Sequence, residues 1–144
     1  MGTQENKEVV RKIEEAWDSG KIDDIAQYFA PTFHNHSGVQ GMPHDIDTIK
    51  MVHGMSMGAM PDRKIEILDL IAEGDKVVVR CRMSGSNSGG FPWFGADANN
   101  NKVDAEFFGL YRLENGKVVE HWGVNDGISI LAQVGAWTPP PMPG

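Results

Sequence analysis

The sequence predicts an α+β domain, in which helices cover one face of a cone-shaped, curved antiparallel β-sheet. Apolar residues recur at helical spacing up to Met60, whereas from Lys64 onward long segments alternate between apolar and polar residues. Short turns at Glu73-Gly74-Asp75 and Glu114-Asn115-Gly116 join two pairs of these segments, as expected for antiparallel neighbours. This order favours three N-terminal helices, a sheet and one short C-terminal helix.

The three helices are expected at residues 3–19, 22–29 and 45–60. The first has one apolar stripe, and Glu14 is expected on its solvent side. The second stops before Pro31, because the residue before a proline disfavours the helical conformation. The third is rich in methionine, which suits either a pocket lid or a loosely packed core.

Four strands are expected at residues 64–72, 76–84, 103–113 and 118–124. The long connection at 85–102 contains three aromatic residues, which should pack at a pocket mouth or against another subunit. Asp126 ends the last strand, where it suits either an N-cap of the short final helix or a catalytic role.

Composition narrows the class of protein. The 144 residues suit one domain, expected at 1–137, followed by a proline-rich tail at 138–144. A net charge of −7 argues against nucleic acid as a partner. The lone Cys81 cannot form an internal disulfide, and no apolar run approaches the length of a membrane span, so we expect a cytoplasmic protein without a membrane partner.

Polar residues near the strand ends are the candidates for chemistry. His121 lies on the last strand, and alternation should place His34 and His36 on one face of an earlier extended segment. A zinc pair at the two histidines would need further ligands, and the spacing does not demand one, so no metal is expected. The expected pocket wall comprises Trp17, His36, His53, Trp93, Phe107, Tyr111 and Asn125.

Several short motifs occur in an order that is similar to the SnoaL-like polyketide cyclases. They comprise Glu15-Ala16-Trp17 with Gly20, Asp23 and Ala26; His34-Asn35-His36; Pro61-Asp62; residues 71–78; residues 116–122; Asp126; and Gln133-Val134-Gly135. The resemblance implies the cone fold of the nuclear-transport-factor-2-like proteins. It also implies a cofactor-free enzyme acting on a bulky apolar substrate, as a homodimer or homotetramer.

The chain departs from that family at two places. Characterised aromatic polyketide cyclases have an acidic group on the last strand and a histidine on the strand before it, near Gly123 and Gly109 here. Two missing side chains would leave room for a substrate and remove the expected proton carriers. Trp17 also stands where those cyclases often have a tyrosine.

The leading hypothesis is an acid–base aldol cyclase or isomerase of a polyketide-like substrate. Asp126 is the expected base, His121 and His34 are the expected proton partners or oxyanion donors, and Glu106 is a reserve acid. A non-catalytic module that binds small molecules is the alternative. An epoxide hydrolase built on Asp104, Arg80 and Asp126 is a further one.

Overall fold

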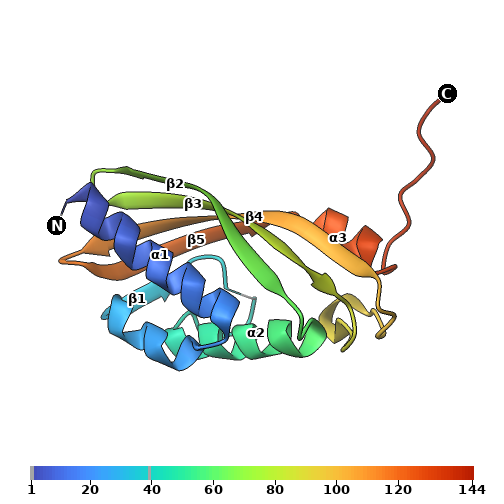
Figure 1. The fold of residues 1–144 in the computed structure, drawn as a ribbon, viewed down its shortest axis with the longest axis horizontal. Coiled ribbons are helices and arrows are strands. Elements are labelled where there is room, and N and C mark those ends of the chain that lie inside the picture. The colour runs from blue at the N-terminus through green and yellow to red at the C-terminus, as the bar shows by residue number, and fades with distance from the viewer. Residues whose placement is uncertain (1, 39) are drawn as a thin grey trace.

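The computed structural model describes residues 2–38 and 40–144, which form helices and one five-stranded sheet (Figure 1). In chain order the elements are α1 (Thr3–Ser19), η1 (Ile22–Tyr28), β1 (Phe29–Asn35), α2 (Ile46–Ala59), β2 (Lys64–Glu73), β3 (Lys76–Ser86), η2 (Pro92–Phe94), β4 (Lys102–Glu114), β5 (Lys117–Asn125) and α3 (Gly127–Gln133). The class is α+β, as predicted.

The sheet is mixed, which corrects the expectation of a purely antiparallel one. Its strand order is β1-β5-β4-β3-β2, and β1 runs parallel to β5. Thus β1 lies between the second and third helical segments, and the second segment, η1, is a 3₁₀ helix. Pro31 fits this edge strand, because an edge position does not need every backbone N–H to donate. A parallel partner distant along the chain leaves no local sequence signal.

Helix α1 packs against β2 and β3 (Figure 1). It does so because Val10 and Ile13 form a fully buried stripe. The helix ends at Gly20, whose φ of 78° is a left-handed conformation that glycine adopts without strain. Gly2 occupies the N-cap position with no side-chain hydrogen bond, and Thr3 is the first helical residue.

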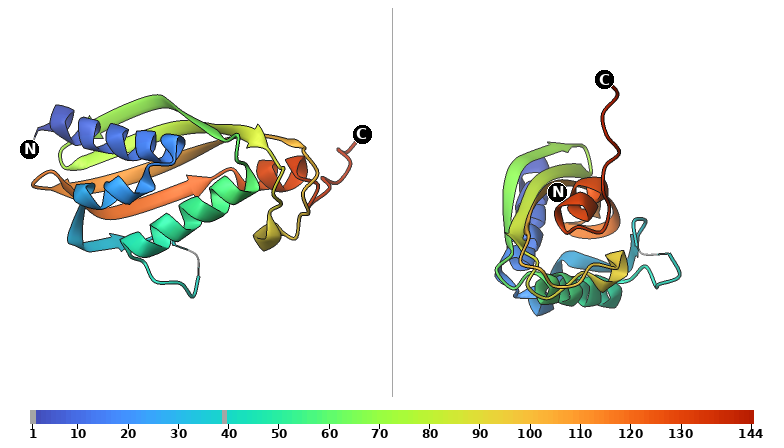
Figure 2. Two further views of the ribbon diagram at one scale, coloured as in Figure 1. Left: turned by 60° about the horizontal axis from the view of Figure 1, so that its bottom comes forward. Right: turned by 90° about the vertical axis from the view of Figure 1, so that its right-hand side faces the viewer.

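Two buried clusters hold the fold together. The first lies between α1, η1 and the inner face of the sheet, and it includes Val77, Val79 and Val118. The second lies at the other end of the sheet, where Ile130 of α3 meets Val103 of β4. The sheet curves around these clusters, α2 lies below it, and the exposed residues 138–144 project away (Figure 2).

Candidate functional site

A pair of glycines marks the centre of the candidate site. Gly109 of β4 is in register with Gly123 of β5, and Tyr111 is in register with His121 one step along. A Cβ atom on Gly109 would lie 3.2 Å from Cε2 of Tyr111 and 3.3 Å from Nε2 of His121. A Cβ atom on Gly123 would lie 3.0 Å from Cε1 of His121. The space left by the two glycines is therefore occupied by the Tyr111 and His121 rings, not by an open void.

The His121 imidazole has a defined tautomer. Oδ1 of Asn35 accepts a hydrogen bond from the Ser37 backbone N–H at 3.2 Å and lies 2.9 Å from Nδ1 of His121. The Ser37 N–H identifies this Asn35 atom as the amide oxygen, and an amide oxygen can accept but not donate a hydrogen bond. Nδ1 of His121 must therefore be the donor and carry the proton, which leaves the lone pair on Nε2. Burial, with a smaller contribution from His36, lowers the pKa of His121 to about 4. The ring is therefore neutral at neutral pH.

Glu14 of α1 points into the protein, which corrects the expectation that it faces solvent. Only 4% of the residue is exposed, and the Tyr111 hydroxyl donates a hydrogen bond of 2.7 Å to its Oε1. Burial raises the pKa of Glu14 to about 7, although the Tyr111 hydrogen bond and the Arg63 charge oppose the shift. Glu14 follows Val10 by one helical turn, so it shares the buried stripe. Its place on this apolar stripe is the sequence feature from which the burial of Glu14 could have been predicted.

These side chains form one contiguous group, which we call the inner polar cluster: Glu14, Tyr111, His121 and Asn35. The ring centroids of Tyr111 and His121 lie 4.7 Å apart, and hydrogen bonds join each ring to its outer neighbour. The cluster draws on α1, β4, β5 and β1. Sequence reasoning found Tyr111 and His121 but missed Glu14 and Asn35.

Trp17, near the C-terminal end of α1, contacts His53 of α2. His53 is buried, its Nε2 lies 3.1 Å from the Trp17 carbonyl oxygen, and the two rings meet edge to face at 5.0 Å. The buried Arg63 guanidinium also donates to this carbonyl, and to Oγ of Ser56 at 2.8 Å. The Arg63 cation stabilises this carbonyl at the end of α1, whereas burial lowers the pKa of His53 and favours its neutral form.

His34 and His36 lie against each other, with ring centroids 4.6 Å apart, and neither side chain makes a hydrogen bond to the His121 ring among the described residues. Both are exposed, and the ring of His36 stacks on Trp122 of β5 at 4.5 Å. Along the extended segment Asn35 has the opposite orientation to its two neighbours. Consequently the Asn35 side chain, and not that of either histidine, makes the hydrogen bond to the His121 ring.

Asp126 is the N-cap of α3. Its two carboxylate oxygens accept from the backbone N–H of Ser129 at 3.2 Å and from the Ser129 hydroxyl at 2.6 Å. These hydrogen bonds lower the pKa of Asp126, which is the opposite of the shift expected for a buried base. The helix-cap interpretation of this residue is the one that the structure shows.

The remaining expected wall residues are spread along one end of the sheet. Phe107 is half-buried on the inner face of β4 and is in register with the exposed Asn125. In the aromatic loop Phe91 is buried in the second core cluster, whereas Trp93 is 42% exposed. The loop thus packs on its own chain through Phe91.

The residues named for epoxide hydrolysis do not converge. Arg80 bonds to Asp69 and Glu106, each at 2.6 Å, on the outer face of the sheet. Asp104 bonds instead to Arg82. Glu106, the reserve acid, is therefore ion-paired and exposed.

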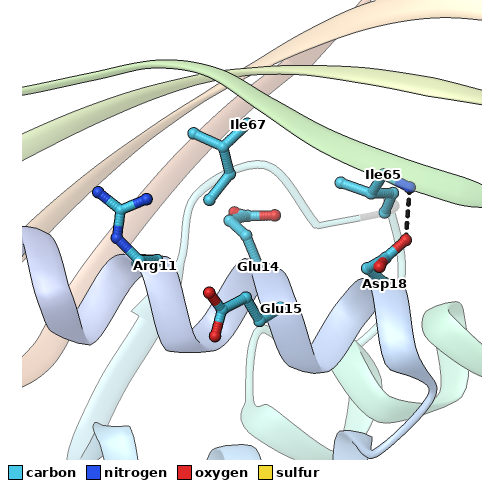
Figure 3. Close-up of a pocket in the computed structure, with 6 residues that line it drawn as sticks. All are labelled: Arg11, Glu14, Glu15, Asp18, Ile65 and Ile67. Atoms are coloured by element: carbon cyan, nitrogen blue, oxygen red, sulfur yellow. Dashed lines mark hydrogen bonds between the residues drawn. The ribbon is translucent and has the colours of Figure 1, made fainter.

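Hollows that open to the surface occur at two places among the described residues that bear on the site. One, of about 230 Å³, lies between α1 and β2 (Figure 3). The other, of about 400 Å³, is lined by residues of the 89–98 loop. Neither is an apolar chamber between the helices and the sheet, where the first core cluster packs instead.

Within residues 2–38 and 40–144, no three His, Cys, Asp or Glu side chains are placed to hold a metal ion. The helices described there include none with the length and apolar character needed to cross a membrane.

Comparisons with known proteins agree with this architecture. AclR of Streptomyces galilaeus, described as a candidate hydroxylase, superposes with a TM-score of 0.84 at 23% identity, covering 97% of this chain and 87% of its own. A candidate polyketide cyclase of Bacillus cereus gives 0.80 at 25% identity, covering 93% and 83%. IdmH of Streptomyces antibioticus, another candidate polyketide cyclase, gives 0.78 at 25% identity, covering 90% and 98%.

No curated protein matches the chain significantly. The family model of the SnoaL-like polyketide cyclases, however, matches residues 7–134. With its nuclear-transport-factor-2-like fold, the chain belongs to the SnoaL-like polyketide cyclase family.

Proposed function

We propose that the protein is a cofactor-free enzyme that catalyses acid–base aldol cyclisation or isomerisation of a bulky, apolar, polyketide-like molecule at the inner polar cluster. One observation carries this proposal. Asn35 holds His121 as the Nδ1–H tautomer, so that the Nε2 lone pair lies over Gly109 and Gly123. The family match and the relatives described as candidate cyclases support the reaction class.

The chemistry needs a proton acceptor and a proton donor. Nε2 of His121 accepts a proton from the carbon next to a substrate carbonyl, and the resulting carbanion attacks a second carbonyl carbon. The new C–C bond leaves an alkoxide, which takes up a proton. Burial lowers the pKa of His121 to about 4 and raises that of Glu14 to about 7, so at neutral pH His121 is an unprotonated acceptor and Glu14 is partly protonated. Such divergent environments are typical of acid–base sites.

The proposal changes the roles expected for two residues. Asp126 stabilises α3, and His34 packs on its neighbours outside the inner polar cluster. Phe107 contacts the apolar body of the substrate, because it is half-buried two positions before Gly109 on the same face of β4.

Hydrogen–deuterium exchange at carbon tests the proton-abstraction step directly. Aryl ketones such as 1-tetralone are screened for binding by thermal shift, and exchange at the carbon beside the carbonyl is followed by mass spectrometry. His121→Gln should slow exchange about 10²-fold or more. His34→Gln, the same change at an exposed histidine, is the matched control and should keep the full rate.

Two results would contradict the proposal. A folded His121→Gln variant with the full exchange rate would remove His121 from the reaction. Ketones that stabilise the protein without exchanging or being converted would favour the alternative, a non-catalytic binding module.

We also propose that the protein forms a homodimer through the outer face of the sheet. Pairing aligns Ile71, Val78, Leu110 and Trp122 in one row across four strands. Beside this row Phe108 and Val124 are 47% and 72% exposed. We call these six residues the outer apolar patch. Ion pairs of Arg80 and Arg112 flank it, so a second copy meets charges of both signs as well as an apolar centre.

A further inference from the structure

The hollow between α1 and β2 ends near the buried carboxylate of Glu14. Its walls are Arg11, Glu14, Glu15 and Asp18 from the helix and Ile65 and Ile67 from the strand (Figure 3). Glu15 is exposed, whereas Glu14 points toward the sheet beneath Ile67. Asp18 ties the helix to the strand by accepting a 2.7 Å hydrogen bond from the Ile65 N–H. The hollow thus leads from solvent toward one side of the inner polar cluster.

We propose that this hollow is the route by which Glu14 exchanges its proton with water, and that Glu14 supplies protons to the reaction through Tyr111. The inference rests on the proposed function, because it assigns the source of the proton that the alkoxide receives. Glu14 is a positioning and proton-carrying residue here, since Tyr111 lies between it and His121.

The proton transfers balance. When Glu14 is protonated, the hydrogen bond reverses: the carboxylic acid donates to the phenol oxygen and the Tyr111 hydroxyl turns its proton toward the substrate alkoxide. The Tyr111 hydroxyl then gives that proton to the alkoxide, and the Glu14 carboxylic acid replaces it on the phenol oxygen. Tyr111 ends neutral and Glu14 ends as a carboxylate, which then takes a proton from water in the hollow. His121, which gained the proton from carbon, releases it to solvent. One proton enters and one leaves in each cycle, with no oxidant or reductant.

The groups around Glu14 allow it to titrate near neutral pH. Burial is the largest influence on its pKa; Tyr111 on β4 and Arg63 before β2 favour the carboxylate. Arg11 and Asp18 face the same hollow from α1. Cys81 of β3 and Tyr111 both have raised pKa values through burial and the Glu14 charge, so both stay protonated at neutral pH.

Chemical labelling tests this route without relying on turnover. A small apolar carbodiimide such as diisopropylcarbodiimide reacts with a protonated carboxyl group and leaves a stable N-acylurea, which mass spectrometry locates. Labelling of Glu14 should be half-maximal near pH 7 and fall about tenfold per pH unit above it. In Tyr111→Phe the midpoint should move upward, because the lost hydrogen bond favoured the carboxylate.

Filling the hollow tests the path itself. Ile67→Trp should abolish the Glu14 adduct, whereas Ile67→Val, which leaves the hollow open, should label as the wild type does. Should Ile67→Trp not fold, the wild-type pH dependence still decides. Absence of a Glu14 adduct, or a midpoint near the ordinary value of 4.5, would overturn the inference.

Activity separates this inference from the proposed function. Glu14→Gln should slow turnover about 10²-fold and remove the fall in rate above pH 7 that the wild type should show. Loss of Glu14 labelling, with exchange still dependent on His121, would reject the route and keep the proposed function. If Glu14 is labelled with a midpoint near pH 7 but exchange does not depend on His121, the route for proton exchange is kept and the proposed function is rejected.

Discussion

Oδ1 of Asn35 lies 2.9 Å from Nδ1 of His121, and this contact joins the edge strand β1 to β5 across 86 residues of sequence. It determines which nitrogen of the imidazole is free to accept a proton. The neighbouring backbone strengthens the junction, since the His36 N–H donates to the His121 carbonyl at 2.8 Å. The chemical state of His121 therefore depends on a strand pairing that sequence patterns do not reveal.

Asn35→Asp should raise the pKa of His121 well above its value of about 4, because a carboxylate beside Nδ1 favours the imidazolium ion. Exchange at carbon should then be lost at a pH below the new value. Histidine NMR titration measures the pKa, and Asn125→Asp, the same change at an exposed position of β5, is the control. An unchanged pKa in Asn35→Asp would show that the contact does not control His121.

Gly123→Ala should displace the His121 ring, because its Cβ atom would lie only 3.0 Å from Cε1. We expect a loss of about 1–3 kcal/mol in the free energy of unfolding and a lower exchange rate. Gly54→Ala on α2, where a Cβ atom meets nothing within 4 Å, should instead stabilise by up to about 1 kcal/mol. Urea unfolding measures both. If Gly123→Ala leaves the free energy of unfolding unchanged, the His121 ring moves aside without cost.

Glu14 and His121 should have opposing effects on stability as pH changes. The pKa of Glu14 is raised from 4.5 to about 7, so its carboxyl group loses stability as pH rises through that interval. The pKa of His121 is lowered from 6.5 to about 4, so its imidazole gains stability from pH 4 to pH 6.5. Each contribution is about 3 kcal/mol at most.

Single variants should reveal the two opposing slopes by urea unfolding between pH 4.5 and 8. Relative to the wild type, Glu14→Gln should gain stability as pH rises, and His121→Gln should lose it. Parallel curves for the wild type and Glu14→Gln would show that Glu14 does not titrate in this range.

Asp126→Asn should keep the exchange rate, because Asn caps a helix about as well as Asp. Asp126→Ala should cost about 1 kcal/mol of stability through the lost cap while also keeping the rate. Carbon exchange and urea unfolding check the pair. A large drop in the rate of a folded Asp126→Asn variant would restore the catalytic role that the sequence suggested.

Phe108→Lys should convert the proposed dimer to a monomer, because it places a charge in the outer apolar patch. Ile128→Lys is the matched control, since Ile128 is 61% exposed on α3, outside that patch. Light scattering coupled to size-exclusion chromatography gives the mass. Equal masses for wild type and Phe108→Lys would exclude this face as the interface.

Local patterns were sufficient for much of the fold. The C-terminal strands are recognisable because β4 and the first half of β3 alternate between buried and more exposed residues, and because turn residues such as Asn115 and Gly116 bound the segments. The pattern could not reveal β1, because its pairing partner β5 lies more than 80 residues away along the chain. The candidate site depended on the same pairing, since Asn35 enters it only through β1.

The sequence by itself determined the α+β class, the family and the presence of Tyr111 and His121 on facing strands. Periodicity and short motifs record which surface of each element is apolar, and that information is local. Only the tertiary structure decided that Glu14 is buried beside Tyr111, that Asp126 caps a helix and that Asn35 orients His121. Burial and hydrogen bonds between distant segments shift pKa values and select tautomers. This burial and these hydrogen bonds form only when the chain folds.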